Sequence, residues 1–324
     1  MPFTRAELDR AAEIVYAAMP PTPQYAWPLL RSRFGMEIWV KHENHTPIGA
    51  FKVRGGLVYL DRMKRERPGR GAISATRGNH GQSLAFAGRR LGVPVTLLVP
   101  HGNAREKNAA MGAWGAELME HGRDFDAARL RAAEIAAERG LEMVPPFHRD
   151  LVLGVASYAL ELFTSVPDLD AVYVPIGCGS GICGLIAVRD LLGLSTDIVG
   201  VVSAGAPAYA RSFAEGRCVE TEHAETFADG MAVRVPVPAA LDAILRGAAR
   251  VVEVDDDAVA EAIRALHEDT HNLAEGAGAA PLAALAKERD AMRGRRAAVI
   301  LSGGNIDRAW AAEVLAGRTP RVDR

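Results

Sequence analysis

The strongest constraint on the fold is the regular alternation of short apolar segments with helix-forming segments along almost the whole chain. Segments 95–99 and 298–301 are almost entirely apolar, which is typical of strands that are covered on both faces. Helical periodicity fills most of the intervals between such segments. The alternation predicts an α/β fold with two open, twisted, mostly parallel sheets flanked by helices.

The same patterns predict where the individual elements lie. An N-terminal helix begins after Thr4, which forms a capping box with Glu7, and ends before Pro20. Strands are predicted near residues 37–41, 71–75, 94–99, 116–119, 170–176, 197–203 and 296–301. Helices are predicted at 79–91, 103–113, 124–139, 150–164, 181–192, 257–270, 276–288 and 305–316, with a further helical run after Lys52.

The chain length of 324 residues is typical of two domains. Residues from about 50 to 151 have their own alternation of strands and helices, bracketed by a Thr46-Pro47 turn and by Pro145-Pro146. We expect a small, mobile domain at 50–151, inserted in a large ligand-binding domain formed by 1–49 and 152–324. The least regular stretch, 204–250, is rich in proline, and we expect it to wrap or cover a site.

Composition excludes several classes of protein. Apolar residues make up 49% and charged residues 24% of the chain, as in a globular enzyme, and a net charge of -2 argues against nucleic-acid or membrane partners. Three cysteines without paired spacing argue against zinc and suit a reducing compartment. The chain begins without a secretory signal pattern. We therefore expect a cytoplasmic protein, with a small-molecule partner.

Lys52 is the first candidate for a catalytic residue. It follows a Thr-Pro-x-Gly turn and precedes an apolar helical run, so it lies at the start of a helix between Phe51 and Val53. Partial desolvation there would favour the neutral amine, which can attack a carbonyl to form a Schiff base. The alternative is an ordinary helix start, at which the lysine extends its charge to solvent.

A glycine-rich loop at 177–181 follows the apolar strand 171–176 and opens another helix. Glycines allow the backbone to approach a phosphate, while the N–H groups and the helix N-terminus provide a favourable field. A tight turn that needs glycine for steric reasons is the alternative. Gly179–Gly184 also fits the dinucleotide motif, but the next strand, 198–205, ends without the carboxylate expected to bind a ribose. A smaller phosphate ligand therefore fits better.

Two more turns follow predicted strands. At 74–82, small polar residues and free N–H groups at a helix start suit a carboxylate, and the Asn79 amide can donate to a phenolate oxygen. Capping of that helix by Thr76 or Asn79 is an alternative use of the same groups. The turn at 301–305 presents the hydroxyl of Ser302, although it could also be a simple surface turn.

Together with Lys41-His42-Glu43-Asn44, these stretches resemble the fold type II family of pyridoxal-phosphate-dependent enzymes, in particular its serine/threonine dehydratase and serine racemase branch. The resemblance covers almost the whole chain and depends on the order and spacing of the motifs. It implies that pyridoxal 5'-phosphate is bound in a Schiff base with Lys52. It also implies that Phe51 packs on the cofactor ring, Asn79 bonds its 3-hydroxyl, Ser302 faces its pyridine nitrogen and Glu275 lies at its edge. The phosphate would be held by Gly177, Cys178, Gly179, Ser180 and Gly181. Taken as bare sequence, Glu275 is also explained as a helix N-terminal charge.

The resemblance implies a lyase that converts a β-hydroxy amino acid to a 2-oxo acid and ammonia by α,β-elimination, with a substrate site at Thr76, Arg77, Gly78 and His80. Threonine, serine, phenylserine and 3-hydroxyaspartate are the candidate substrates, and a homodimer is expected. A racemase or β-replacement enzyme of the same fold is the first alternative. A nucleotide-binding oxidoreductase is the alternative from another class.

The sequence departs from the family pattern in three places. Cys178 and Ser180 interrupt a phosphate loop that is usually four glycines. Arg77 occupies a position that holds a small residue in the dehydratases and, in serine racemase, a serine that acts as a catalytic base. A guanidinium cannot act as a base at neutral pH. We expect Arg77 to clamp the α-carboxylate or to bind a second acidic group, the alternative being a structural or solvated role. Ser203, Pro207 and Tyr209 replace the expected ligands of a divalent cation, so we expect no metal site. A C-terminal regulatory domain is also not expected.

Overall fold

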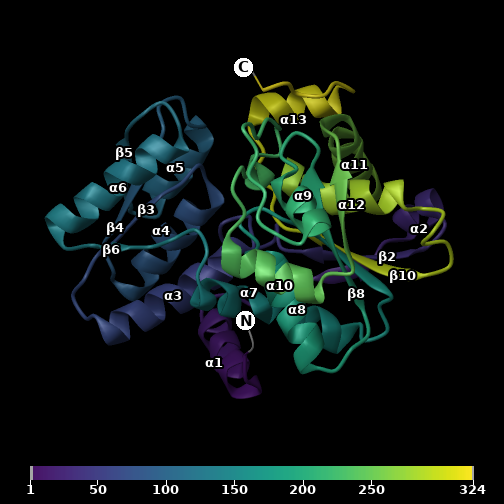
Figure 1. Ribbon diagram of the computed structural model, residues 1–324, viewed down its shortest axis with the longest axis horizontal. Helices are drawn as coiled ribbons and strands as arrows, with labels where there is room; N and C mark the ends of the chain where they lie inside the picture. Colours follow the sequence, from purple (N-terminus) through teal and green to yellow (C-terminus); the bar gives the residue numbers. More distant parts are fainter. Residues whose placement is uncertain (1–2, 323–324) are drawn as a thin grey trace.

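The computed structural model describes residues 3–322, which form two sheets surrounded by helices (Figure 1). The strands are β1 (Gln24–Ala26), β2 (Glu37–His42), β3 (Ala72–Ala75), β4 (Val95–Val99), β5 (Glu117–Glu120), β6 (Glu142–Met143), β7 (Ala171–Pro175), β8 (Asp197–Ser203), β9 (Arg250–Val254) and β10 (Arg296–Leu301). The helices are α1 (Arg5–Tyr16), α2 (Pro28–Phe34), α3 (Lys52–Glu66), α4 (Asn79–Leu91), α5 (Arg105–Ala113), α6 (Phe125–Arg139), α7 (Arg149–Ser165), α8 (Ser180–Leu191), α9 (Ala208–Glu215), α10 (Pro238–Gly247), α11 (Asp256–Thr270), α12 (Gly276–Lys287) and α13 (Arg308–Leu315), with a short 3-10 helix, η1 (Asp229–Met231).

Six strands form the larger sheet, in the order β1-β2-β10-β7-β8-β9. All its pairings are parallel except that of the edge strand β1 with β2. The smaller sheet has the order β5-β4-β3-β6 and is parallel throughout. The predicted α/β class with two mostly parallel sheets is therefore confirmed.

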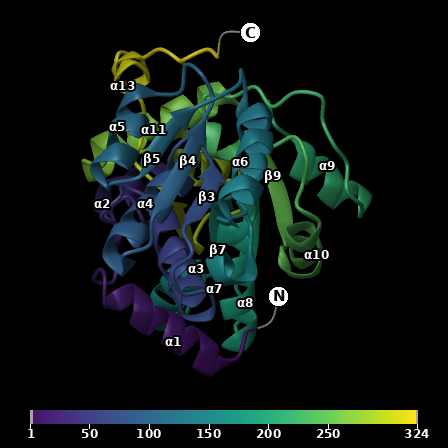
Figure 2. The same cartoon turned by 90° about the vertical axis from the view of Figure 1, so that its left-hand side faces the viewer.

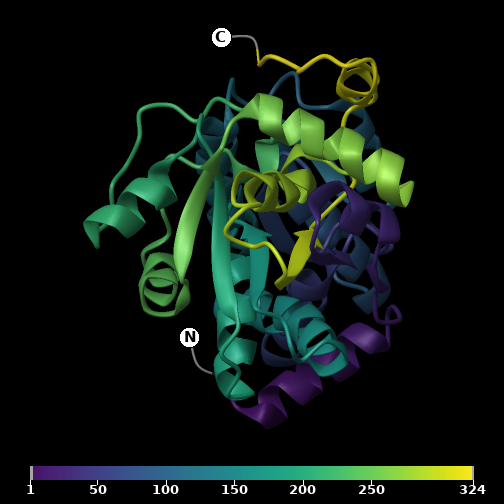
Figure 3. The same cartoon turned by 90° about the vertical axis from the view of Figure 1, so that its right-hand side faces the viewer.

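Alternating residues of β7 show how the larger sheet is covered. Val172 and Val174 belong to a core that includes residues of α7 and α8, whereas Ala171 and Tyr173 belong to a second core with residues of α11 and α12. Figure 3 shows α11 and α12 on the outer side of this sheet. Both faces of the central strands are thus buried, which explains their continuous apolar sequences.

The smaller sheet is covered in the same way. Ile73 and Leu98 pack with Ala128, Ala132 and Ile135 of α6. Other residues of β3 and β4 join the larger core together with residues of α3 and α4. Figure 2 shows this sheet with α6 in front of it. Strands of the smaller sheet all come from residues 72–143, but the predicted domain limits and the mobility of 50–151 stay predictions.

The stretch 204–250 is more regular than predicted. It contains α9, η1 and α10, and β9 begins at its end, none of which was predicted. In the sequence, the prolines of this stretch suggest irregular structure. However, α10 begins with Pro238, and in the first turn of a helix a missing N–H costs nothing. The short elements β1, β6 and α2 were also missed. Within residues 3–322, no helix combines the length and apolar character needed to span a bilayer.

Candidate active site

Lys52 is the first residue of α3, at the carboxyl edge of the larger sheet. A bridge between Ala50 and Gly303, and a 2.9 Å hydrogen bond from the Phe51 N–H to the Ser302 carbonyl, attach this turn to the end of β10. The Lys52 Nζ atom lies 5.0 Å from the centre of the Phe51 ring and donates to the Ser180 Oγ atom at 3.2 Å. The end of β10 therefore positions the lysine.

The environment of Lys52 favours the uncharged amine. Burial lowers the pKa of Lys52, and the nearby Cys178 and Glu275 offset this effect only in part. A larger fraction of the amine is consequently neutral at a given pH than for a lysine in water. Such an amine can attack a carbonyl, as the sequence predicts.

The glycine loop 177–181 joins β7 to α8 and lies opposite Lys52. Gly179 has φ +94°, a left-handed conformation that favours glycine, and a Cβ atom on Gly177 would collide with the Gly230 carbonyl oxygen. Helix α8 begins at Ser180, which is buried. The loop thus brings backbone close to a helix N-terminus, which is a favourable place for an anion.

Two tyrosines hold the backbone of this loop. The Tyr209 hydroxyl donates to the Cys178 carbonyl at 3.3 Å and accepts a hydrogen bond from the Val237 N–H at 2.9 Å. The Tyr158 hydroxyl donates to the Gly181 carbonyl at 3.2 Å, and its ring contacts Phe51 edge-on. Burial raises the pKa of the Cys178 thiol, so this cysteine is a poor nucleophile.

The turn from Thr76 to His80 precedes α4 in the smaller sheet. The Thr76 hydroxyl accepts hydrogen bonds from the N–H groups of Gly78 and Gly81, both at 3.0 Å, so it stabilises the turn. The N-cap residue of α4 is Gly78, so the alternative interpretation, in which Thr76 or Asn79 caps this helix, was wrong. His80 has a buried Nε2 atom without a partner among the described residues. Burial, with a contribution from Lys52, lowers the pKa of His80 to about 3, so His80 is a neutral residue.

Asn79 connects this turn to the larger sheet. Its Nδ2 atom donates to the Glu275 Oε1 atom at 2.8 Å, and its Oδ1 atom accepts from the Asn305 Nδ2 atom at 2.8 Å. Burial and the charge of Asp229 raise the pKa of Glu275 to about 7, against the effects of Lys107 and Asn79. The Glu275 Oε2 atom is buried and has no partner within residues 3–322.

Two residues of the site, Lys107 and Asp229, were not predicted to act in it. The Lys107 side chain is 8% exposed and forms an ion pair with Asp229 of η1, 2.5 Å from Nζ to Oδ2. A Cβ atom on Gly78 would lie 2.8 Å from the Lys107 Cδ atom, so the lysine packs against the Thr76–His80 turn. Lys107 was not predicted because it has the sequence pattern of a solvated helix face.

The charged residues before and after Lys52 are also explained by the structure. Arg54 is fully buried and forms ion pairs with Glu43, at 2.7 Å, and with Glu161, at 2.6 Å. Glu161 also accepts from the Lys41 Nζ atom at 2.5 Å. This cluster joins β2, α3 and α7, and it holds the first turn of the helix that carries Lys52.

Arg77 is the predicted site residue that the structure does not bring into contact with the others. Its side chain is exposed, and it forms no hydrogen bond or ion pair with any residue from 3 to 322. Its neighbour Gly78 is buried, so the turn itself reaches the site while the guanidinium lies at its rim.

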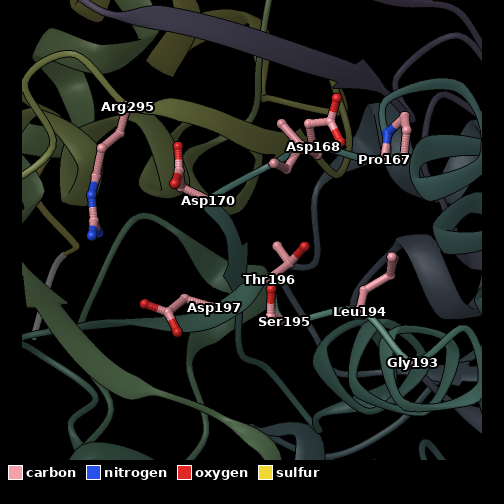
Figure 4. A pocket seen from close by; sticks show the side chains of 10 residues that line it. Pro167, Asp168, Asp170, Gly193, Leu194, Ser195, Thr196, Asp197 and Arg295 are labelled. Atoms are coloured by element: carbon pink, nitrogen blue, oxygen red, sulfur yellow. The ribbon is translucent and has the colours of Figure 1, made fainter.

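A surface hollow at the opposite edge of the larger sheet contains none of the predicted residues. Its lining includes Asp168 and Asp170 before β7, Asp197 at the start of β8, and Arg295 before β10 (Figure 4). Ligands of open parallel sheets bind at the carboxyl ends of the strands, where Lys52 and the glycine loop lie. Among the described residues no three side chains are arranged to hold a metal ion. The expectation that no metal is required remains a prediction.

The residues around Lys52 fit a phosphorylated aldehyde. An amine with a lowered pKa faces a glycine loop at a helix N-terminus, and the buried Glu275 Oε2 and His80 Nε2 atoms lack partners within the described chain. Buried polar atoms without a partner are unfavourable unless a ligand provides one. The carboxamide of Asn79 and the backbone around Ser302 complete the surroundings.

Comparisons with known proteins agree with this geometry. Residues 15–303 match the family model described as pyridoxal-phosphate dependent enzyme. The L-threonine ammonia-lyase of Geobacter sulfurreducens is 38% identical over 276 residues, covering 85% of this chain and 69% of that protein. The biosynthetic L-threonine dehydratase of Haemophilus influenzae is 31% identical, covering 90% of this chain but only 58% of that protein. Processed threonine deaminase isoform 2 from Solanum lycopersicum superposes with a TM-score of 0.89 at 28% identity, covering 98% of this chain and 95% of the other.

Proposed function

The chain belongs to the family of pyridoxal-phosphate dependent enzymes, and from this premise we propose that it is a lyase that converts a β-hydroxy amino acid to a 2-oxo acid and ammonia. Elimination of the β-hydroxyl expels water, and hydrolysis of the resulting imine takes up water again and releases the ammonia. The product would be a 2-oxo acid, and threonine is the first candidate substrate. Support comes from the L-threonine ammonia-lyase and L-threonine dehydratase to which the chain is similar over most of its length.

The observation that carries the proposal is the placement of Lys52. Its half-buried amine has a lowered pKa and lies 3.2 Å from Ser180, the first residue of the helix behind the glycine loop. The amine that binds the aldehyde and the loop that binds the phosphate must lie close together, because both groups belong to one small ligand. No other lysine of the described chain combines these two features.

Each residue has a distinct task in the reaction. Pyridoxal phosphate, when bound, accepts the electron pair that remains when the Cα proton of the substrate is removed. The Lys52 amine takes that proton, for which it must be neutral, and the burial of its side chain favours this state. The N–H groups at the start of α4 would orient the substrate carboxylate, with the Thr76 hydroxyl holding the turn in shape.

The remaining site residues would hold the cofactor. Gly177, Cys178, Gly179, Ser180 and Gly181 would bind the phosphate, Phe51 the ring face, and Asn79 the 3-oxygen. Ser302 is buried, and its hydroxyl would meet the pyridine nitrogen without supplying a proton as a carboxylic acid does. A nitrogen without this proton would favour elimination over transamination.

Several finer features belong to the same proposal. Serine, phenylserine and 3-hydroxyaspartate are further candidate substrates. We also propose that the protein is a homodimer and acts in the cytoplasm. Nucleic acids and membranes are not expected as partners, because the net charge is only -2 and, within residues 3–322, no helix suited to span a bilayer is found.

Ammonia release from the four candidate amino acids, by protein loaded with pyridoxal phosphate, tests the function. Borohydride reduction followed by peptide mass spectrometry should place the cofactor on Lys52. The Lys52→Ala variant should lose ~10³-fold or more in kcat, because attachment and proton transfer both disappear. Lys64→Ala is the matched control, since Lys64 is an exposed lysine on the same helix. A protein that binds no cofactor, or a Lys52→Ala variant that keeps its activity, would refute the proposal.

A further inference from the structure

Asn305, in the turn after β10, has a side chain whose donors are both used. Its Nδ2 atom donates to the Ile48 carbonyl at 2.8 Å and to the Asn79 Oδ1 atom at 2.8 Å. A carboxamide nitrogen has two hydrogens, so neither remains free. Gly49, with φ +68°, makes room for this side chain, because a Cβ atom there would lie 2.8 Å from the Asn305 Oδ1 atom. The Asn305 carboxamide is therefore fixed in one orientation.

This orientation determines that of Asn79. The carbonyl of Asn79 faces Asn305, and its Nδ2 atom uses one hydrogen to bond Glu275. One Nδ2 hydrogen of Asn79 therefore remains for a ligand. If the Asn79 carboxamide were rotated by half a turn, its NH₂ group would face the NH₂ group of Asn305, and two donors would meet without an acceptor.

We propose that Asn305 is a positioning residue, which keeps an N–H of Asn79, rather than its carbonyl, available to the 3-oxygen of pyridoxal phosphate. The inference rests on the proposed function, because it needs the cofactor in this site. An N–H stabilises a negatively charged 3-oxygen, whereas a carbonyl would repel it. The bond also joins the turn before α4 to the end of β10, so it couples the cofactor site to the contact between the two sheets.

Glu275 can set the same orientation only while it is ionised. A carboxylate accepts from the Asn79 NH₂ group, but a protonated carboxyl group can donate to the Asn79 carbonyl instead. The pKa of Glu275 is about 7, because burial and Asp229 raise it more than Lys107, Asn79 and the backbone N–H of Asn305 lower it. Lys52 is the other titratable residue near it. Asn305 does not titrate, so it sets the orientation at every pH.

Two variants of Asn305 test the inference with the bound cofactor as the probe. Asn305→Ala should weaken cofactor binding ~10-fold, which corresponds to one hydrogen bond to a charged group. The absorption spectrum of its bound cofactor should change between about pH 6 and 8 more than that of the wild type, as Glu275 alone orients Asn79. Asn305→Asp keeps the size of the side chain and replaces the donor, so it gives the answer if the alanine variant does not fold.

A double-mutant cycle separates positioning from mere packing. In an Asn79→Ala background, Asn305→Ala should cause no further loss of cofactor affinity. Asn103→Ala is the matched control, since it removes a 2.6 Å bond between two carboxamides, Asn103 and Asn108, and should leave affinity and spectrum unchanged. Equal losses with and without Asn79, or wild-type spectra in both Asn305 variants, would overturn the inference while the proposed function stands. Wild-type protein that binds no cofactor would overturn both.

Discussion

The Nζ atom of Lys107 on α5 lies 2.5 Å from the Oδ2 atom of Asp229 on η1, and this ion pair connects the two sheets beside the Thr76–His80 turn. Burial lowers the pKa of Lys107, but Asp229 and Glu275 raise it more, and the net shift is upward. Lys107 therefore stays charged at neutral pH. The Lys107 side chain is 8% exposed and that of Asp229 29%, so solvent screens this pair less than it screens fully exposed charges.

We predict that Lys107→Met raises KM for threonine ~10-fold, because the substrate turn loses its support and Asp229 loses a partner worth about 1–3 kcal/mol. The cofactor should remain bound with a normal spectrum. Arg234→Gln is the matched control: it breaks an exposed pair with Asp126 that also links the two sheets, and it should change KM less than about twofold. Steady-state kinetics measure both; equal effects of the two variants would contradict the assigned role.

Glu275 makes the stability of the cofactor-free protein depend on pH. Its pKa rises from 4.5 in the unfolded chain to about 7 in the folded protein, so the folded state holds this proton more tightly. The contribution of Glu275 to the free energy of unfolding is fully present below about pH 4.5 and is lost as the pH rises through about 7. This contribution is about 3 kcal/mol. Urea unfolding at about pH 5 and pH 8 should show that Glu275→Gln loses less stability over this interval than the wild type. If the stability of the two proteins changed equally between these pH values, this role of Glu275 would be contradicted.

Arg54 should be the most sensitive structural residue near the site. Its replacement by methionine leaves the carboxylates of Glu43 and Glu161 buried with fewer partners, and we expect a loss of about 3–5 kcal/mol in the free energy of unfolding. Arg65→Met on the same helix is the control. Arg65 is 66% exposed and pairs with Asp61, so its loss should cost less than about 1 kcal/mol. Denaturant unfolding measures both, and a small effect at Arg54 would argue against the role of this cluster.

Arg77 is predicted to affect substrate choice at the rim of the site. Its exposed guanidinium has no partner among residues 3–322, so it is free to meet a second carboxylate of a substrate. Arg77→Ala should raise KM for 3-hydroxyaspartate ~5-fold, as an exposed ion pair allows, and KM for threonine less than twofold. Arg77→Lys keeps the charge, so its KM for 3-hydroxyaspartate should lie between the values of the wild type and of Arg77→Ala. Equal losses on the two substrates would favour a clamp on the α-carboxylate instead.

Several features of the site could be predicted because they depend on neighbours in the sequence. Lys52 follows a turn, and the loops at 177–181 and 302–305 follow apolar strands. Parallel strands bring their carboxyl ends to one edge of a sheet, so these loops meet whenever the strands pair. The structure adds the 3.2 Å contact between Lys52 and Ser180, which the pattern of single segments does not contain.

Other features could not be predicted, because they depend on residues that are distant in the sequence. Lys107 resembles any lysine on a solvated helix until α5 packs near η1. Helices α9 and α10 were not predicted, because prolines and polar residues weaken the helical pattern of this stretch. The stability of such helices comes from their packing against other elements.

By itself, the sequence determined the alternation of strands and helices, the two-sheet class and the turn that carries Lys52, since periodicity and turn chemistry act over a few residues. Only the tertiary structure decided which polar groups pair: Asn305 with Asn79, Lys107 with Asp229, and Arg54 with two carboxylates. Hydrogen bonds and ion pairs are short-ranged and directional, so they form only after the packing of whole elements has brought their atoms together.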